Sequence, residues 1–395
     1  MRLLHTSDWH LGRSFHREDL LGAQSRFLDH LVEVVRSESV DAVLVAGDVY
    51  DRALPPIDAV SLLDESLRRL TDAGASVVVI SGNHDSSRRL GFASKLLDRA
   101  GVYVRTDPGT SGQPVLLADE HGGVAIYPLP YLEPDAAGAA LECDERAHAA
   151  VTSAAMARVR ADLAARPGTR SVVMAHLFAT GGEASESERD ISVGGLCDVP
   201  LAAFAGIDYT ALGHLHGPQR LSDAVRYSGS PLPYSFSEEH QRKSTWLVEL
   251  AATGVGSVTR VDSPVHRPLA RLRGQLTDLL VDAAYDRWSS HYLAVTLTDP
   301  VRPRDPMERL RARFPHTLLL EFDPEGGVGR DASSYTARLR GRSDLDIATG
   351  FVEFVRDRAA DEWEKTLLRE AIELSGREQP ALERSALDVV QGRTA

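Results

Sequence analysis

Five short polar motifs, each placed directly after an apolar run, constrain this chain more than any other feature of its sequence. They are SDWH (7–10), GDVYD (47–51), GNHD (82–85), AHLF (175–178) and GHLH (213–216). The runs before the second and third motifs are continuous and rich in β-branched residues, which indicates buried strands. Open α/β sheets place their sites at the carboxyl ends of strands. We therefore expect side chains from all five motifs to meet at one edge of the fold.

Helix-like stretches separate these strands over the first ~260 residues, as expected of an α/β layer architecture with helices packed on sheet. Apolar residues at helical spacing, with Pro before and Gly after one of the segments, predict helices. The expected helices are 20–37, 57–73 and 144–165. The expected strands are 2–7, 42–47, 76–82, 123–130, 171–176, 209–214, 226–230 and 244–250.

A second region begins near residues 261–270. It is predicted to be a small β-α-β-α-β unit, followed by a connector at 325–334 and a helical tail at about 346–376. Its expected elements are a helix at 274–285, a strand at 291–298, a helix at 305–314 and a strand at 316–322. A length of 395 residues is enough for two or three domains. The domains are predicted as 1–263, 264–345 and 346–395.

The five motifs carry seven side chains able to bind a metal ion. They are Asp8, His10, Asp48, Asn83, His176, His214 and His216. This mixture of carboxylate, carboxamide and imidazole suits Mn²⁺, Fe²⁺ or Zn²⁺, whereas a Mg²⁺ site would be richer in oxygen. Each motif alone could be a turn, because Asn and Asp readily adopt turn conformations. Turn chemistry does not explain five motifs in this order, each after its own strand.

This ordered set resembles the calcineurin-like metallophosphoesterase superfamily, whose pattern is D-x-H, G-D-x-x-D, G-N-H-D/E, a single His and G-H-x-H. The resemblance implies that one metal is held by Asp8, His10, Asp48 and His216. It implies that a second metal is held by Asp48, Asn83, His176 and His214, with Asp48 bridging. His84 would then be catalytic, protonating the leaving oxygen or steadying the phosphate. Asp51 and Asp85 would orient neighbouring groups by hydrogen bonds.

Longer motifs are similar to the SbcD family, the nuclease subunits of bacterial SbcCD complexes, over essentially the whole chain. These motifs are SDWHLGRSFH, GDVYDRALPP, YTALGHLHGPQ and GSPLPYSFSE. The resemblance implies a metallophosphoesterase β-sandwich flanked by helices, a small α/β capping domain and a helical C-terminal tail. It also implies ATP-dependent double-strand exonuclease and single-strand or hairpin endonuclease activity with two divalent ions, most often Mn²⁺, in DNA repair, replication and recombination.

The same resemblance implies partners. The tail would dock on an SbcC-type SMC-like ATPase, or alternatively pack on its own cap. Helices 57–73 and 88–99 would form a homodimer within a heterotetramer. DNA, as duplex ends or hairpins, would be contacted by Arg13, His16 and Arg17 in the loop after the first motif, and by Ser230. Residues 264–345 hold 13 Arg against 11 Asp and Glu, which fits either phosphate contacts or a solvated surface.

Two other functions stay open on the residues alone. A small-molecule phosphodiesterase or phosphatase could use the same core, although such chains usually end soon after G-H-x-H. A non-catalytic DNA-end scaffold is the other, and the intact ligand set argues against it. The formal charge of −13 argues against a protein coated in nucleic acid. Two separated cysteines, with no secretory signal pattern and no apolar run of ~18 residues, favour the cytoplasm, near the nucleoid, with no membrane.

Overall fold

The computed structural model describes residues 1–191, 198–325, 342–356, 358–372 and 374, without the side chains of 354–356. The chain divides into two compact units, residues 1–324 and 325–395, which are described separately. The predicted domain limits at 263 and 345 remain predictions.

Two six-stranded sheets form the body of the first unit. The first sheet has the order β16 (Gly254–Asp262), β15 (Ser244–Ala251), β1 (Arg2–Thr6), β4 (Ala42–Ala46), β5 (Ser76–Ile80) and β6 (Val102–Arg105). The second has the order β13 (Gln219–Arg220), β14 (Val225–Tyr227), β12 (Tyr209–Gly213), β9 (Arg170–His176), β8 (Gly122–Pro128) and β7 (Val115–Asp119). Strands β1, β4, β5 and β6 are parallel to one another, as are β8, β9, β12 and β14.

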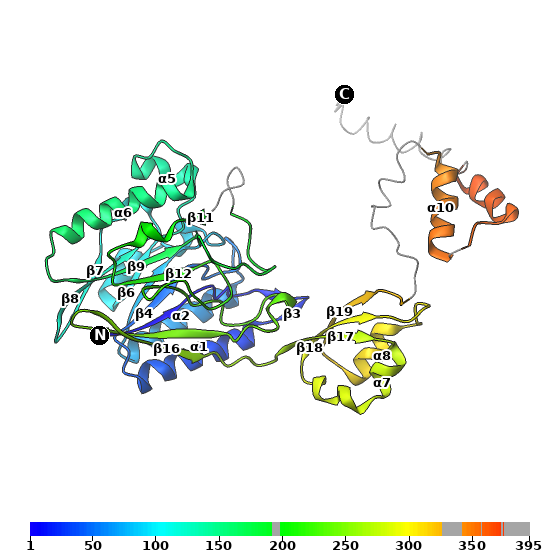
Figure 1. The fold of residues 1–395 in the computed structure, drawn as a ribbon, viewed down its shortest axis with the longest axis horizontal. Helices are drawn as coiled ribbons and strands as arrows, with labels where there is room; N and C mark the ends of the chain where they lie inside the picture. Colours follow the sequence, from blue (N-terminus) through cyan, green and yellow to red (C-terminus); the bar gives the residue numbers. More distant parts are fainter. Residues whose placement is uncertain (192–197, 326–341, 357, 373, 375–395) are drawn as a thin grey trace, which may run out of the picture. The chain divides into compact units, whose positions relative to one another are not determined.

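The two sheets pack face to face, and helices cover their outer faces (Figure 1). An apolar cluster that includes Leu44, Val78 and Met174 fills the space between the sheets. Helices α1 (Leu21–Ser37) and α2 (Ile57–Asp72) bury their apolar faces on the first sheet. Helices α5 (Pro134–Leu141) and α6 (His148–Ala164) cover the second sheet. The predicted sandwich flanked by helices is confirmed, and parallel strands buried on both faces explain the continuous apolar runs.

The segment predicted as one helix at 88–99 is instead broken into short turns. Helix α3 (Ser87–Leu90) is followed by α4 (Ser94–Leu97) and a 3-10 turn at Asp98–Ala100. Ala93 lies between them with a φ of 59°, a left-handed conformation that no α-helix continues through. The helical spacing of Phe92 and Leu96 therefore does not reflect one helix face.

A smaller parallel sheet follows the sandwich, with the order β17 (Leu269–Gly274), β18 (Tyr292–Leu297) and β19 (Thr317–Phe322). Helices α7 (Leu276–Val281) and α8 (Pro306–Arg313) pack on it around Leu279, Val295 and Phe314. The predicted helix 274–285 is shorter than expected and continues as a 3-10 segment, Ala283–Trp288. A further apolar cluster joins this sheet to the sandwich through Phe15, Phe236 and Leu269. The predicted α/β cap is confirmed as a small parallel sheet with helices.

Short elements complete the first unit. They are β2 (Ser14–Phe15), β3 (Glu18–Asp19), β10 (Phe178–Ala179), β11 (Asp198–Val199) and 3-10 turns at Pro108–Thr110, Leu201–Phe204 and Phe236–Glu238.

In the second unit, α10 (Asp344–Arg356) and residues 362–372 are helical, as predicted for the tail. The connector predicted at 325–334 lies outside the described residues after 325. Among the described residues, no helix combines the length and apolarity needed to cross a membrane.

Candidate metal centre

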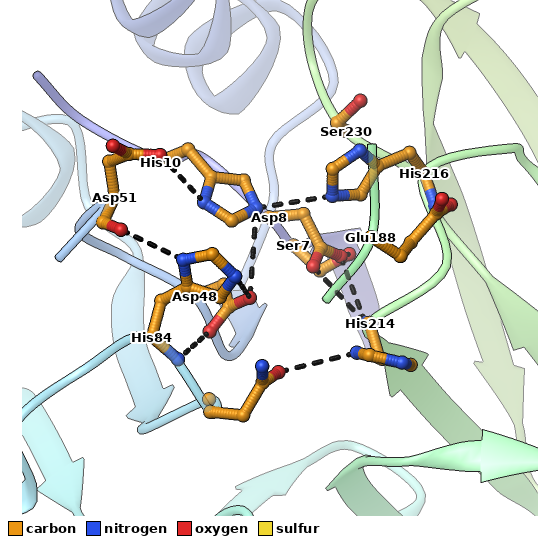
Figure 2. A network of polar contacts seen from close by, with 12 residues as sticks. Ser7, Asp8, His10, Asp48, Asp51, His84, Glu188, His214, His216 and Ser230 are labelled. Carbon is orange, nitrogen blue, oxygen red and sulfur yellow. Dashed lines mark hydrogen bonds and ion pairs between the residues drawn. The ribbon is translucent and has the colours of Figure 1, made fainter. Parts of the chain in front are cut away.

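The five motifs meet at the carboxyl edge of the sandwich, as their positions after strands predict. Asp8 and His10 follow β1, Asp48 follows β4, and Asn83 follows β5 in the first sheet. His176 ends β9 in the second sheet, and His214 and His216 follow β12. Figure 2 shows the side chains of Asp8, His10, Asp48, His214 and His216 turned toward a common centre. All the Asp and His members of the set are buried.

One half of the centre is formed by Asp8, His10 and His216. The two imidazoles present their Nε2 atoms to each other at 3.1 Å. Ligand atoms of these three residues lie within 4.8 Å of one another. Their proximity, with a carboxylate beside two imidazole nitrogens, gives the geometry of a metal-binding group.

The other half is formed by Asn83, His176 and His214. The Asn83 Oδ1 atom lies 2.9 Å from His176 Nε2 and 3.3 Å from His214 Nδ1. A carboxamide oxygen and two imidazole nitrogens thus face a single point. The second sheet supplies only imidazoles to the centre, whereas the first supplies both carboxylates and the carboxamide.

Asp48 lies between the two halves. Its Oδ2 atom is 3.6 Å from His10 Nε2 and 3.5 Å from His176 Nε2. Its Oδ1 atom accepts a hydrogen bond from the backbone N–H of His84 at 2.9 Å. A carboxylate in this position can contact an ion in either half, as a bridging ligand requires.

The backbone at this edge is strained. Asp8, His10, Asp48 and His214 have φ values of 53°, 44°, 48° and 105°. Such left-handed conformations cost about 1–3 kcal/mol each in residues other than glycine, and they cluster at functional sites.

Motif glycines are needed because the loops after neighbouring strands approach closely at this edge, both within the first sheet and between the two sheets. A Cβ atom at Gly82 would overlap Asp48 Oδ1, and a Cβ atom at Gly47 would overlap the ring of His176. The glycines of GNHD and GDVYD are therefore part of the site, since they let the ligands approach one another.

The ionisation of the site differs from one side chain to the next. Burial raises the pKa of Asp8. Burial alone would also raise the pKa of Asp48, but the surrounding histidines, His176 foremost, hold it well below its ordinary value. Burial lowers the pKa of His214 to about 3. Burial opposes charge on His176 too, yet the Asp48 carboxylate raises its pKa to about 9. An ionised carboxylate beside the His10 and His214 imidazoles, which burial keeps neutral by lowering their pKa values, provides ligands for a cation. On His176, a bound cation would take the place of the proton that Asp48 favours.

His84 lies at the edge of the two halves. Its Nδ1 atom bonds to the Asp51 carbonyl oxygen at 2.8 Å, and its Nε2 atom is 3.9 Å from Asp48 Oδ2. Its ring packs edge-on against His10, with centroids 4.7 Å apart. Distance alone would allow His84 to join His10 and Asp48 as a ligand.

The two carboxylates predicted to orient neighbours differ in their contacts. Asp85 accepts hydrogen bonds from the backbone N–H groups of Gly82, Val49 and Tyr50, at 2.9, 3.1 and 2.9 Å. It thereby ties the third motif to the second. Asp51 Oδ1 lies 3.7 Å from His10 Nδ1 and 3.7 Å from Arg13.

The predicted DNA contacts are placed in different environments. His16 and Arg17 are exposed, with φ values of 48° and 74°. The Arg13 guanidinium lies over the Tyr234 ring and donates to the Ser187 carbonyl at 3.2 Å. Ser230 is fully buried and donates to the Leu232 carbonyl, so its hydroxyl offers no surface to DNA. Its place in the GSPLP motif reflects packing, and the prediction of a DNA contact there is corrected.

A second layer of polar groups behind the ligands was not predicted from the sequence. Ser187, Glu188, Glu238 and Lys243 contact His216 or one another, and Ser7 Oγ donates to Asp8 at 2.5 Å. These residues lie outside the five motifs, except Ser7. Two signals were available: Glu238 ends the GSPLPYSFSE motif, and Lys243 is an isolated lysine in a chain with three lysines.

The residues present fit a pair of divalent metal ions. Carboxylate, carboxamide and imidazole atoms converge in two groups that share one carboxylate, and the three candidate clusters found among the described residues all belong to this centre. These donors suit several divalent metals.

Comparison with known proteins agrees with this arrangement. Residues 1–218 match the family model described as calcineurin-like phosphoesterase. Residues 265–356 match the SbcD C-terminal model, described as the type 5 capsule protein repressor C-terminal domain. The region matched by the first model contains all seven candidate ligands.

Two solved structures show distant similarity. The protein TT1561 of Thermus thermophilus has 12% identity and a TM-score of 0.38, covering 66% of this chain and 98% of its own. GAP50, the anchor in the inner membrane complex of Plasmodium, has 11% identity and a TM-score of 0.33, covering 82% of this chain and 98% of its own.

Proposed function

The chain belongs to the calcineurin-like phosphoesterase family, and from this premise we propose that it is the nuclease subunit of an SbcCD-type complex. One observation carries the proposal: a core with seven convergent metal ligands is followed by a region that matches the SbcD C-terminal model. The core supports a metal-dependent phosphoesterase. The match of the C-terminal region to the SbcD model supports DNA as the phosphodiester substrate.

Asp8, His10, Asp48 and His216 would hold one ion, and Asp48, Asn83, His176 and His214 the other. When bound, two divalent ions supply a water of lowered pKa and neutralise charge that develops on the phosphoryl oxygens. We propose Mn²⁺ because it is the ion that the SbcD resemblance implies, and the mixed nitrogen and oxygen donors are compatible with it.

His84 is proposed to protonate the leaving oxygen. The Asp51 carbonyl can only accept, so the His84 Nδ1 atom carries a proton and the Nε2 atom faces the centre. A proton on Nε2, which lies 3.9 Å from Asp48 Oδ2, can be delivered to the departing oxygen. Asp85 and Asp51 are proposed to hold Asp48, His10 and the motif backbone in place.

DNA is proposed to enter beside the loop that carries Arg13, His16 and Arg17. Arg13 is half-buried, with its NH1 atom 3.7 Å from Asp51 Oδ1, whereas His16 and Arg17 are exposed and are the better phosphate contacts in this loop. On the cap, Arg273, Arg311 and Arg313 already bond to cap groups, whereas Arg302 and Arg304 are exposed. Arg302 and Arg304 are therefore the better phosphate contacts on this surface.

A homodimer contact is proposed on the outer side of α2, α3 and α4. Ile57 and Phe92 are 83% and 81% exposed, and Leu96 is also exposed. Leu62, Leu63 and Leu67 of α2, by contrast, pack against the sandwich core. Exposed apolar side chains gathered on neighbouring turns are typical of a protein interface.

The second unit is proposed to dock on the coiled-coil base of an SMC-like ATPase. Trp363 and Leu367 lie four residues apart in its helical residues 362–372, and both are exposed. This spacing places both side chains on one helix face, which a partner helix can cover.

The experiment that tests the function is cleavage of end-labelled linear duplex DNA and of hairpin DNA by the purified chain with MnCl₂. The reaction should be run with and without an SMC-like ATPase and ATP, and compared with a chromogenic phosphodiester. We expect DNA cleavage that needs Mn²⁺. Hydrolysis of cyclic nucleotides without any cleavage of DNA would favour a small-molecule phosphodiesterase. A chain that binds DNA ends but hydrolyses no ester would favour a scaffold.

A further inference from the structure

We propose that Ser187, Glu238 and Lys243 form a hydrogen-bonded relay that positions the imidazole of His216 for its metal. Ser187 is the positioning residue, and the other two hold it in place. This inference rests on the proposed two-metal function and adds to it residues outside the five motifs.

Ser187 makes the contact that fixes the ring. Its hydroxyl lies 2.5 Å from His216 Nδ1 and is also hydrogen-bonded to Glu238 Oε1. A carboxylate can only accept, so the hydroxyl proton points to Glu238 and the hydroxyl oxygen accepts from His216. This order places the imidazole proton on Nδ1.

The proton on Nδ1 leaves a lone pair on Nε2, the atom that faces His10 Nε2 at 3.1 Å. A metal ion binds an imidazole nitrogen through its lone pair, and the bond made by the other nitrogen selects the tautomer. Ser187 thus sets which nitrogen is available and in which direction it points.

Glu238 is held in its ionised form at the end of the relay. It is buried, and its Oε2 atom lies 2.5 Å from Lys243 Nζ and accepts from the Tyr234 N–H at 3.1 Å. Lys243 is itself buried and also donates to the His216 carbonyl at 2.8 Å and to Ser230 Oγ at 3.0 Å. A buried charge pair with its hydrogen bonds filled makes a rigid anchor.

His216 is therefore held at three points. Ser187 binds the ring, Lys243 binds the backbone carbonyl, and the Glu188 carboxylate accepts the backbone N–H at 2.7 Å. Two of these groups come from the loop between β10 and β11, and Arg13 donates to the Ser187 carbonyl in that loop. His214 in the other half, by contrast, has its backbone N–H bonded to Asp8.

The test compares Mn²⁺ binding by the full chain in three variants, measured by titration calorimetry, with thermal melting of the metal-free proteins alongside. Ser187→Ala should weaken one of the two Mn²⁺ sites by about 10–100-fold and leave the other unchanged. Ser187→Thr keeps the hydroxyl and should restore most of the affinity. Ser237→Ala is the matched control, because the Ser237 hydroxyl holds the Glu186 N–H of the same loop but does not contact His216.

The outcomes separate this inference from the proposed function. If the unaltered chain binds no pair of Mn²⁺ ions, the two-metal function is wrong. If it binds two and Ser187→Ala binds both as tightly, the relay alone is wrong. Equal weakening of both sites, or the same loss in Ser237→Ala, would show that the loop acts only as a scaffold and would overturn the positioning role.

Discussion

Buried charges occur at both ends of the sandwich, and they are satisfied in opposite ways. At the amino ends of the strands, the Arg170 guanidinium bonds to both Asp119 oxygens, and the Met1 ammonium lies 2.6 Å from Asp119. Arg170 also donates hydrogen bonds to the carbonyls of Leu250 and Gly122. At the carboxyl ends, Asp48 and its neighbours face imidazoles across distances of 3.5–3.6 Å.

This difference indicates that the cluster at the amino ends of the strands stabilises the fold, whereas the cluster at the carboxyl ends is arranged to bind a ligand. The Arg170 cluster places one carboxylate between two cations, so its charges contact one another directly and join the two sheets. The metal centre instead gathers acceptors on a strained backbone, which destabilises the folded chain until a cation is bound. Substitutions in the Arg170 cluster should therefore affect stability, and substitutions in the metal centre should affect metal binding.

The largest effect should come from Asp48→Asn. The change removes the one negative charge shared by both halves, so both metals should bind more weakly and cleavage should fall by about 10³-fold or more. Elemental analysis of the purified protein and a DNA cleavage assay measure this. Asp119→Asn is the matched control at the other end and should keep its metal content. Full metal occupancy in Asp48→Asn would contradict a bridging role.

His84→Gln should separate catalysis from metal binding. If His84 donates a proton and is not a ligand, cleavage should fall by about 10²–10⁴-fold while the metal content stays the same. The same two assays apply, with His240→Gln as a control, because His240 is exposed and distant from the ligands in sequence. Loss of metal together with activity would make His84 a ligand.

Arg170→Met should lower stability without affecting the metals. Removing one partner of a buried pair leaves a buried carboxylate, at a cost of about 3 kcal/mol in the free energy of unfolding. Denaturant unfolding measures this cost, and Mn²⁺ titration should show two sites of unchanged affinity. Weakened metal binding would mean that the two ends of the sandwich are coupled.

The smallest expected effect is on the free energy of unfolding at acidic pH. Hydrogen bonding from Arg170, followed by the Met1 ammonium, holds the pKa of Asp119 well below its usual range. Because the folded pKa is the lower one, the stabilisation is present above the unfolded pKa of about 4 and is lost as pH falls below it. The free energy of unfolding of the unaltered chain should therefore drop more steeply below about pH 4 than that of Asp119→Asn. Parallel pH profiles would contradict this.

Much of the fold was accessible from local patterns. The buried strands before Asp48 and Asn83 were predicted to within two residues, because a parallel strand covered on both faces needs a continuous apolar run. The helix at 88–99 was wrong, because the left-handed backbone at Ala93 interrupts an otherwise helical spacing. The DNA contact predicted at Ser230 was corrected, because its buried hydroxyl accepts a hydrogen bond from Lys243 and donates one to the Leu232 carbonyl.

The sequence by itself determined the seven candidate ligands and their positions after strands, since metal-binding side chains and strand ends both leave local signals. The division of those ligands around Asp48 is implied by the family resemblance and stays a prediction, whereas only the tertiary structure decided which remote groups contact them. Ser187 and Lys243 lie in loops, where no local pattern distinguishes them from solvated residues, and Glu238 ends the GSPLPYSFSE motif without a local sign of its contacts. Folding brings Ser187 to His216 across 29 positions and to Glu238 across 51, and no local sequence signal specifies such a pairing.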